Sequence, residues 1–300
     1  MVQTKLIKTL IYKIVEDVSS VVEYSLKRLN IIIWRQQVLL KDRVAIITGG
    51  AVGIGRGIAL KFAEEGCSVV IADISEAEGK KTAEAVSKKG REGVFIRCDV
   101  TDNRQVQDMV SKVISKFGKI DILVNNAGGV SGPGVSTEDM TEEQWDKIVN
   151  LNLKSQFLCC KAVIPHMKEK KCGKIINVSS LGAVHPPAPI AHYHAAKGGV
   201  LGLTTNLAFE LAPYHICVNA ILPGPIRSEF YTEILKTVPD EDAFFAMLGS
   251  RVPLGRMGTP EDIAGPALFL ASELSDYVTA ESILVAGGIP LEPRDISKTG

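Results

Sequence analysis

From about residue 43 onward, short runs of apolar, β-branched residues alternate with longer amphipathic stretches. The apolar runs read "RVAIIT", "CSVVIAD", "GVFIRCD", "IDILVNN", "KIINVSS", "ICVNAIL" and "SILVAGG". Between them we predict helices near residues 54–66, 75–89, 103–117, 141–170, 192–212 and 260–273. Runs that are apolar almost throughout are typical of parallel strands covered on both faces. The alternation therefore predicts an α/β fold built on a doubly wound, seven-stranded parallel sheet.

The first forty residues do not share this alternation. Leu6, Leu10, Ile14, Val18, Val22 and Leu26 recur every four positions, which predicts an amphipathic helix. Interspersed charges keep every apolar run far shorter than the roughly 20 residues that a membrane span needs. We predict a helical extension over 1–40, one domain over 41–290 with a substrate lid around 229–250, and a polar tail over 291–300. Packing on the protein or a neighbouring subunit, membrane contact and organelle targeting all remain open for the extension.

Composition excludes several classes of function. The chain has no formal net charge and 23% charged residues, which gives no reason to expect a nucleic-acid partner. Its six cysteines lack CxxC spacing, so neither a zinc site nor a disulfide framework is indicated. Reduced cysteines favour a cytoplasmic location. The five histidines are scattered, and we predict no metal site.

A glycine-rich loop follows the first predicted strand and opens the first helix. It reads "TGGAVGIG", from Thr48 to Gly55. Gly49 allows a tight turn, Gly53 makes room for a pyrophosphate, and Gly55 lets the helix approach the sheet. Asp73 ends the second strand about 20 residues later, where a carboxylate accepts hydrogen bonds from ribose hydroxyls. The carboxylate also repels a 2′-phosphate, so the pattern favours NAD(H) and disfavours NADP(H).

The stretch "YHAAK" places Tyr193 four residues before Lys197. On a helix, residues at this spacing lie on one face. A nearby ammonium favours the phenolate, so we expect Lys197 to lower the pKa of Tyr193 from its usual value of about 10. The pair is suited to general acid–base catalysis, although a lone YxxxK pattern is more often a surface pair.

Taken together, seven motifs resemble the short-chain dehydrogenase/reductase family over about residues 42–290. They are "TGGAVGIG", "CDVTD", "NNAG", "NLNLKS", "INVSS", "YHAAK" and "PGPIRS". The resemblance implies a Rossmann fold that holds cofactor and substrate in one domain, assembled as a homotetramer or homodimer. Three residues depart from the family pattern: Cys217 replaces a frequent arginine, Ala280 a frequent glycine and Ala286 a frequent aspartate.

The resemblance also implies site residues. The catalytic residues are Asn152, Ser180, Tyr193 and Lys197, with Ser180 preferred to Ser179 and Asn152 to Asn150 because of their spacing. The residues expected to bind the cofactor are Gly49, Gly53, Ile54, Gly55, Asp73, Asp99, Val100, Asn126, Ala127, Gly128, Tyr193, Lys197, Pro223, Gly224, Ile226 and Ser228. Tyr193 would exchange the substrate proton, Ser180 would steady the oxyanion, and Asn152 would hold a water linked to Lys197.

These features favour an NAD(H)-dependent oxidoreductase that interconverts a secondary alcohol and a ketone. One alternative is a 3-oxoacyl thioester reductase acting on acyl carrier protein. Asp73 disfavours it because such enzymes usually use NADPH. Tyr214 disfavours it because the members that bind the carrier protein often have arginine at this position. The other is a non-catalytic NAD(H)-binding regulator, which the complete catalytic set disfavours.

The substrate is the least constrained prediction. Apolar residues dominate the segments expected to line the pocket: Val130, Leu181, Val184, Ile190, Phe230, Tyr231, Ile234, Leu235, Phe244, Phe245 and Met247. No arginine is placed by the sequence to bind a carboxylate. The composition of this pocket predicts a neutral aliphatic or alicyclic alcohol or ketone.

Overall fold

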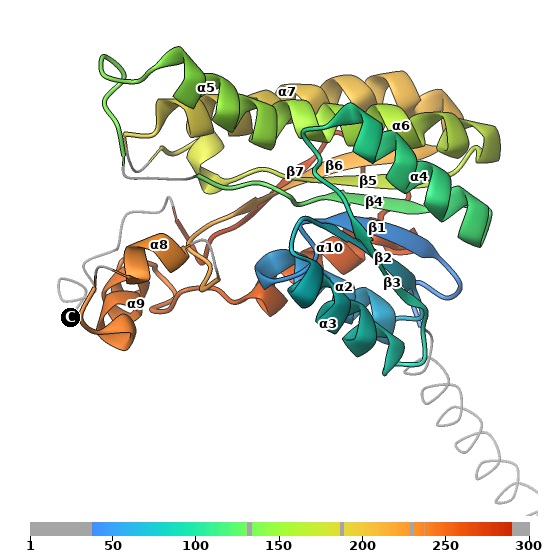
Figure 1. Ribbon diagram of the computed structural model, residues 1–300, viewed down its shortest axis with the longest axis horizontal. Coiled ribbons are helices and arrows are strands. Elements are labelled where there is room, and N and C mark those ends of the chain that lie inside the picture. Colours follow the sequence, from blue (N-terminus) through green and yellow to red (C-terminus); the bar gives the residue numbers. More distant parts are fainter. Residues whose placement is uncertain (1–37, 131–133, 187–188, 229–230, 237, 290–300) are drawn as a thin grey trace, which may run out of the picture. The chain divides into compact units, whose positions relative to one another are not determined.

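The computed structural model describes residues 38–130, 134–186, 189–228, 231–236 and 238–289. The predicted N-terminal helix and C-terminal tail therefore lie outside the described residues, apart from residues 38–40. The described part forms a seven-stranded sheet in the order β3-β2-β1-β4-β5-β6-β7 (Figure 1). Every strand pair is parallel. The predicted α/β fold with a doubly wound parallel sheet is confirmed.

The strands coincide with the seven apolar runs of the sequence. They are β1 (Val44–Thr48), β2 (Ser68–Asp73), β3 (Gly93–Arg97), β4 (Ile122–Asn125), β5 (Gly173–Val178), β6 (Ile216–Pro223) and β7 (Ser282–Val285). The helices are α2 (Gly53–Glu64), α3 (Glu76–Ser87), α4 (Asn103–Phe117), α5 (Glu142–Val149), α6 (Ser155–Lys170), α7 (Ala191–Leu211), α8 (Thr232–Leu235), α9 (Glu241–Ser250) and α10 (Pro260–Ala271).

Two apolar cores lie on opposite faces of the sheet. Alternate residues of each central strand contribute to each core: Ala45 and Ile47 of β1 belong to one, and Val44 and Ile46 to the other. The first core packs under α2, α3 and α10, and the second under α4, α6 and α7. Figure 1 shows these two groups of helices below and above the sheet. Burial on both faces is the reason that the strands are apolar throughout.

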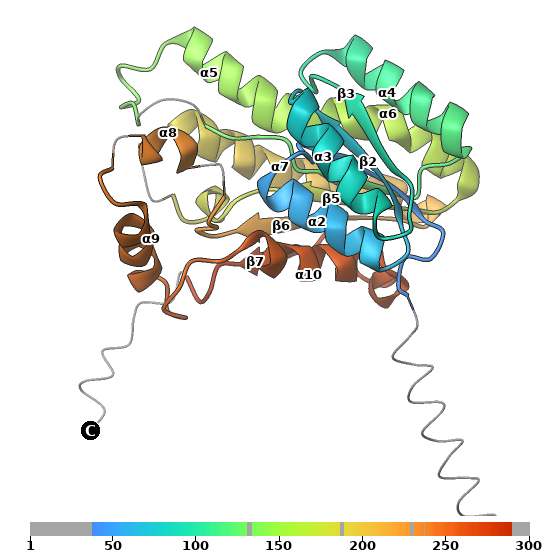
Figure 2. The ribbon, with the colours of Figure 1, turned by 60° about the horizontal axis from the view of Figure 1, so that its bottom comes forward.

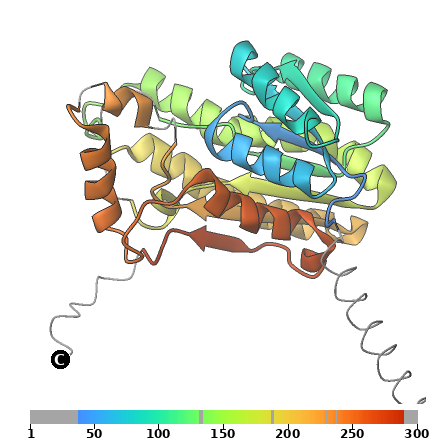
Figure 3. The ribbon, with the colours of Figure 1, turned by 90° about the horizontal axis from the view of Figure 1, so that it is seen from below.

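Close helix contact on the first face depends on a glycine. In Figure 3, α2 and α10 lie side by side along the sheet. A Cβ at Gly57 of α2 would lie 2.8 Å from Cβ of Pro260, the first residue of α10. The absence of a side chain at Gly57 thus sets how closely the two helices pack.

Local signals fix several of the helix ends. Asp102 accepts a hydrogen bond from the Arg104 N–H at the start of α4, and Gly118 ends that helix with a left-handed φ of 70°. Thr141 forms a capping box with Gln144 at the start of α5. The predicted helix over 141–170 contains a π-helical turn, Asn150–Lys154, between α5 and α6. Such turns often mark functional sites, and this one carries Asn152.

The site forms at the carboxyl ends of the strands. The chain runs from β1 to β2 and β3 on one side and then crosses to β4 on the other side of β1. In sheets of this kind ligands bind where the strand order reverses. Figure 2 shows α8 and α9 together at one end of the sheet, beyond the strands.

Ala280 is held in a backbone conformation that favours glycine. Its φ is 65°, and its N–H donates to the Val218 carbonyl at 2.9 Å. The side chain is exposed, so no core contact compensates for the left-handed conformation. The departure from the family's glycine at this position therefore costs stability.

We expect Ala280→Gly to raise the free energy of unfolding by about 1 kcal/mol, because glycine adopts positive φ without strain. Ala286→Gly is the control, since Ala286 is 7% exposed and is not among the positive-φ residues; it should not stabilise the protein. Urea denaturation of the three proteins measures both effects. Equal stability of Ala280→Gly and wild type would contradict the assignment of strain.

Candidate active site

The glycine loop packs tightly against the end of β4. Gly49 has a φ of 61° and Gly53 a φ of 54°, so both require the left-handed region. A Cβ at Gly49 would lie 2.8 Å from the Ala127 Cα. A Cβ at Gly55 would collide with the Gly49 carbonyl and with the Asn126 side chain. Gly55 thus lets α2 approach the loop and Asn126, whereas the sequence analysis expected it to permit approach to the sheet.

The start of α2 is suited to an anion. Its N-cap residue, Val52, makes no side-chain capping bond, and the first turn contains no acidic residue. By contrast, Asp102 and Thr141 cap α4 and α5. Free N–H groups at a helix start, with the positive end of the helix dipole, favour a phosphate. The loop therefore fits the pyrophosphate of a dinucleotide, and Ile54 anchors this turn by packing on the first core.

Asp73 lies at the end of β2 with both carboxylate oxygens engaged. Oδ2 accepts from the Ala51 N–H at 3.0 Å and Oδ1 from the Ser75 N–H at 2.9 Å. These bonds fix the carboxylate beside the glycine loop, where a ribose would lie. The register pairs Asp73 with Arg97 on β3. This exposed arginine is a cation near the ribose position that the sequence analysis did not consider.

Asp99 and Val100 follow β3. Asp99 Oδ1 accepts from the N–H and the hydroxyl of Thr101, at 2.9 and 2.7 Å. Val100 is 6% exposed and packs in the second core. The carboxylate thus shapes a turn whose two residues, by the family resemblance, are expected to contact the cofactor.

Asn126 joins the ends of β1 and β4. Its Nδ2 donates to the Thr48 and Gly49 carbonyls at 3.0 and 2.9 Å. In return, the Thr48 hydroxyl accepts from the N–H groups of Asn126 and Ala127, both at 3.0 Å. Asn126 and Ala127 thus hold the crevice in shape, a structural role in addition to the cofactor contact predicted for them.

The buried Asn152 fixes the segment after β4. Its Oδ1 accepts from the Gly129 N–H at 3.0 Å, and its Nδ2 donates to the Gly129 and Ile148 carbonyls at 2.8 and 3.0 Å. Both amide hydrogens are therefore used, which leaves one lone pair on Oδ1. Any water that Asn152 holds must donate to that lone pair.

Gly128 separates Asn152 from Lys197. A Cβ at Gly128 would lie 2.7 Å from Asn152 Oδ1 and 3.2 Å from Lys197 Nζ. The amide oxygen and the ammonium thus face the same small space, which a side chain at residue 128 would fill. This brings together three of the residues predicted for the site.

The two serines after β5 face different neighbours. Ser179 is buried, and its hydroxyl donates to the Lys197 carbonyl at 2.8 Å. Ser180 accepts from the Gly182 N–H at 3.1 Å and is hydrogen-bonded to Tyr193, which lowers the pKa of the tyrosine in part. Ser180 is therefore the serine adjacent to the phenol.

Burial controls the charges of Tyr193 and Lys197. It raises the pKa of Tyr193, and the hydrogen bond with Ser180 only partly offsets this effect. Lys197 Nζ lies 5.7 Å from the Tyr193 ring centroid and donates to the Val178 carbonyl at 2.9 Å. Burial lowers the pKa of Lys197 to about 8. The prediction that Lys197 gives Tyr193 a lowered pKa is wrong, because burial raises this pKa and the partial offset comes from the hydrogen bond with Ser180.

The segment after β6 lies across the crevice. Pro223 ends β6, and a Cβ at Gly224 would lie 2.7 Å from the Ala286 Cα. Ile226 is 5% exposed and forms a β-bridge with Gly258. The Ser228 hydroxyl donates to the Ile226 carbonyl at 3.3 Å. These contacts show that the four predicted residues lie together in one short segment.

Aromatic rings gather in the lid. Tyr231 lies with its ring centroid 6.0 Å from that of Phe244 and 5.8 Å from that of Phe245. Burial raises the pKa of Tyr231, with a further contribution from Tyr193, which places Tyr231 near Tyr193. Leu181 and Phe245 are buried, Val184 and Met247 are exposed, and the predicted pocket residues Phe230 and Ile234 lie outside the described side chains.

Arg227 occupies the same loop as the predicted cofactor turn. Its Nη2 lies 3.0 Å from Asp242 Oδ1 and 3.5 Å from Glu241 Oε1, and its guanidinium lies 4.5 Å from the Phe245 ring centroid. The two acids of α9 balance its charge. An arginine does lie near the pocket, but its hydrogen bonds are directed to the lid.

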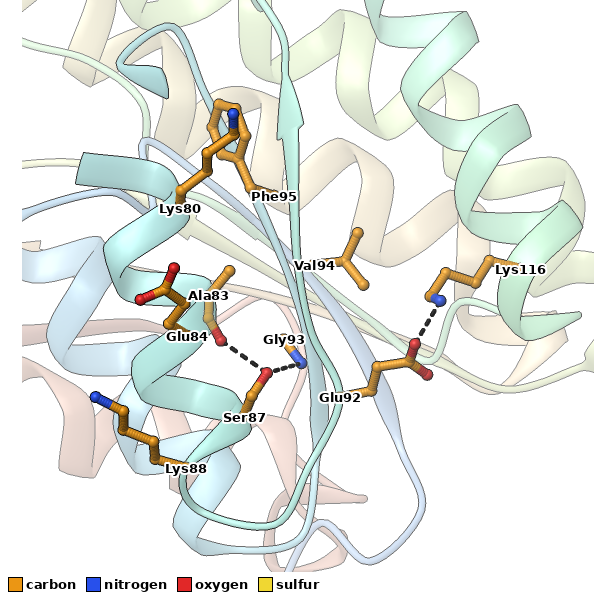
Figure 4. Close-up of a pocket in the computed structure, with 10 residues that line it drawn as sticks. All are labelled: Lys80, Ala83, Glu84, Ser87, Lys88, Glu92, Gly93, Val94, Phe95 and Lys116. Carbon is orange, nitrogen blue, oxygen red and sulfur yellow. Dashed lines mark hydrogen bonds and ion pairs between the residues drawn. The ribbon is translucent and has the colours of Figure 1, made fainter. Parts of the chain in front are cut away.

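Two hollows lie away from these residues. One, of about 680 Å³, is a surface groove between α3 and the edge strand β3 (Figure 4). In it the Ser87 hydroxyl accepts from the Gly93 N–H, and Lys116 pairs with Glu92. The other, of about 600 Å³, contains Cys172 and Cys217. Neither includes a residue of the predicted site.

Among the described residues, no group of three or more His, Cys, Asp or Glu side chains could hold a metal ion. In the same part of the chain, no helix combines the length and apolarity needed to cross a bilayer.

Comparison with known proteins places this site in a family. A family model described as enoyl-(acyl carrier protein) reductase matches residues 49–290, which is most of the chain. The chain belongs to the short-chain dehydrogenase/reductase family. It is therefore an NAD(P)-dependent oxidoreductase of that family.

Relatives in this family differ in their named substrates. A subunit of (2S)-[(R)-hydroxy(phenyl)methyl]succinyl-CoA dehydrogenase from Thauera aromatica is 40% identical, over 83% of this chain and 97% of the relative. The 3-oxoacyl-[acyl-carrier-protein] reductase of Chlamydia pneumoniae is 41% identical, over 84% and 98%. The crystal structure of levodione reductase aligns with a TM-score of 0.78 at 34% identity, over 83% and 98%. The substrates in these three names differ from one another.

Proposed function

We propose that this short-chain dehydrogenase/reductase is NAD(H)-dependent and interconverts a neutral secondary alcohol and its ketone, with Tyr193 as general acid and base. The observation that carries the proposal is the contact of Tyr193 with Ser180, beside the Lys197 ammonium and its close approach to Gly128. These groups offer a proton donor, a second hydroxyl and a cation around one point of the crevice. That arrangement suits proton exchange at an oxygen whose carbon gains or loses hydride.

NAD(H), when bound, supplies the hydride acceptor or donor. In reduction, the Tyr193 phenol gives its proton to the carbonyl oxygen as the alcohol forms. In oxidation, the phenolate removes the hydroxyl proton. Ser180 donates a hydrogen bond to the same oxygen and stabilises the negative charge that develops there.

Lys197 and Asn152 complete the arrangement. The ammonium holds the ribose beside Gly128, and the remaining lone pair of Asn152 Oδ1 accepts from a water that carries the proton onward. The Asn152 amide also bonds Gly129, which links the segment after β4 to the π-helical turn.

NAD(H) is the preferred cofactor in this proposal. Asp73 holds a carboxylate beside the glycine loop through two N–H bonds, and the exposed Ile74 contributes no charge. Arg97 is the residue that most opposes this preference, because the register places it beside Asp73. The fixed carboxylate is nearer to the loop and repels a 2′-phosphate.

Reduction of a 3-oxoacyl thioester on acyl carrier protein is the second candidate, favoured by the similarity to the Chlamydia pneumoniae reductase. Tyr214, which the sequence analysis compared with an arginine of carrier-binding members, lies against Lys168, whose Nζ is 4.7 Å from its ring centroid. A non-catalytic NAD(H)-binding protein is the third candidate. We also propose a cytoplasmic location and a homotetramer or homodimer.

Turnover tests the enzyme against the non-catalytic protein. Absorbance at 340 nm with NAD and a panel of secondary alcohols should show reduction of the cofactor, and Tyr193→Phe should lower kcat at least about 100-fold, because only the ionisable oxygen is lost. NADH affinity, measured by fluorescence, should stay within about twofold. Tyr277→Phe, at an exposed tyrosine, is the control and should keep full activity. Most activity retained in Tyr193→Phe would exclude the mechanism.

Cofactor preference is tested at Asp73. We expect kcat/KM for NAD to exceed that for NADP by about tenfold or more, and Asp73→Ser with Ile74→Arg to reverse or strongly reduce this ratio, because repulsion of the 2′-phosphate becomes attraction. Arg97→Leu should leave NAD use unchanged and lower any residual use of NADP. Equal use of both cofactors by the wild type would contradict the proposal.

The charge of the substrate is tested with matched alcohols. We expect cyclohexanol to have a higher kcat/KM than 4-hydroxycyclohexanecarboxylate, because the lid is aromatic and Arg227 is already paired. Glu241→Gln combined with Asp242→Asn should raise kcat/KM for the anionic alcohol by freeing Arg227 from both acids. A higher kcat/KM of the wild type for the anionic alcohol would contradict the proposal of a neutral substrate.

A further inference from the structure

One backbone carbonyl receives two side-chain donors at the centre of the site. Val178 O accepts from Lys197 Nζ at 2.9 Å and from Gln156 Nε2 at 3.1 Å. The ladder between β4 and β5 ends at the pair Asn125 and Asn177, one residue before Val178. The carbonyl thus lies past the end of that ladder, where side chains reach it.

Gln156 is an unfavourable residue for packing alone. It lies on α6, four residues after Asn152, and is 2% exposed. Its Oε1 has no hydrogen-bond partner among the described residues. A buried acceptor without a donor costs free energy, whereas methionine or leucine would fill a similar volume without that cost. Turning the amide over would place Oε1 against the Val178 oxygen, so the carbonyl fixes the amide with its N–H directed to that oxygen.

Two donors that share an acceptor weaken one another. The N–H of Gln156 presents its positive end to an oxygen that also holds the ammonium, so it reduces the attraction between Val178 and Lys197 Nζ. The ammonium is then held less firmly on the side of β5 and is freer to face Gly128 and Asn152. Gln156 touches neither the phenol nor the space at Gly128 through any contact found in the described residues.

We propose that Gln156 is a positioning residue, which sets how firmly the Val178 carbonyl holds the Lys197 ammonium. The catalytic use of Lys197 rests on the proposed function, but the sharing of the carbonyl does not. Substitution of Gln156 therefore changes the protonation and placement of Lys197 even where no substrate is present.

The other groups around Lys197 do not mask a small change in its pKa. Tyr193 lies on the same helix, Cys160 lies one turn beyond Gln156 on α6, and Asn152 and Gly128 are neutral. Burial raises the pKa of Cys160 to about 12, so it is uncharged near neutral pH. Among the described residues, no carboxylate contributes to the pKa of Lys197, which burial alone lowers to about 8.

The test is a pH titration of Lys197 by NMR in the full chain labelled with ¹³Cε-lysine. The Lys197 signal is the one that disappears in Lys197→Met. In Gln156→Met we expect the midpoint of this titration to rise by about 0.5 pH unit, because the ammonium regains the whole carbonyl. Cys160→Ala is the control, since Cys160 lies on the same face of α6, bonds Asn125 and makes no contact with Val178; its midpoint should stay within about 0.1 unit of wild type.

An unchanged or lowered midpoint in Gln156→Met, or an equal rise in Cys160→Ala, would overturn the proposal. Gln156→Leu replaces Gln156→Met if the latter does not fold. In turnover assays, the alkaline limb of kcat/KM should shift with the NMR midpoint. Absence of turnover in the wild type would reject the proposed function and leave the NMR result to decide the role of Gln156.

Discussion

The hydrogen bonds between Thr48 and Asn126 hold together the place where the strand order reverses. They join the end of β1 to the end of β4, which are neighbours in the sheet although distant in the sequence. The glycine loop follows directly from one side of this junction, and Ala127 and Gly128 follow from the other. Because the two segments are fixed at contact distance, Gly49 and Gly55 have no room for a Cβ. The cofactor crevice therefore owes its shape to a few polar bonds at strand ends.

The sequence was sufficient to predict the fold because its signals are local. Seven apolar runs became seven strands, since strands buried on both faces need apolar residues at every position. The same is true of helix boundaries at Asp102, Gly118 and Thr141, where capping residues act within one turn. The π-helical turn at Asn152 was missed, because a single five-residue turn is too short to change the apolar pattern of the helices that flank it.

The positions of the site residues in the sequence also predicted that they lie close together. The pKa values of these residues could not be predicted in the same way. Because Tyr193 and Lys197 lie four residues apart on one helix, the ammonium was expected to favour the phenolate. Desolvation by the folded protein instead disfavours the charged form of both side chains. Arg97 and Gln156 were overlooked for a related reason. Only strand register brings Arg97 beside Asp73, and only the end of the β4–β5 ladder exposes Val178 to Gln156. Such contacts depend on tertiary structure and leave no periodic trace.

The opposite shifts of the two ionisable groups bear on the direction of the reaction. The pKa of Tyr193 is raised above its usual value and that of Lys197 is lowered to about 8, so the phenol keeps its proton at a pH where the lysine already begins to lose its own. At neutral pH the tyrosine is therefore a proton donor, the form that carbonyl reduction uses. Oxidation needs the phenolate, whose formation costs more free energy the further the pH lies below the tyrosine pKa. The hydrogen bond from Ser180 reduces this cost. In the proposed mechanism, burial thus keeps available near neutral pH the protonated phenol that reduction uses, and the phenolate that oxidation uses increases as the pH rises.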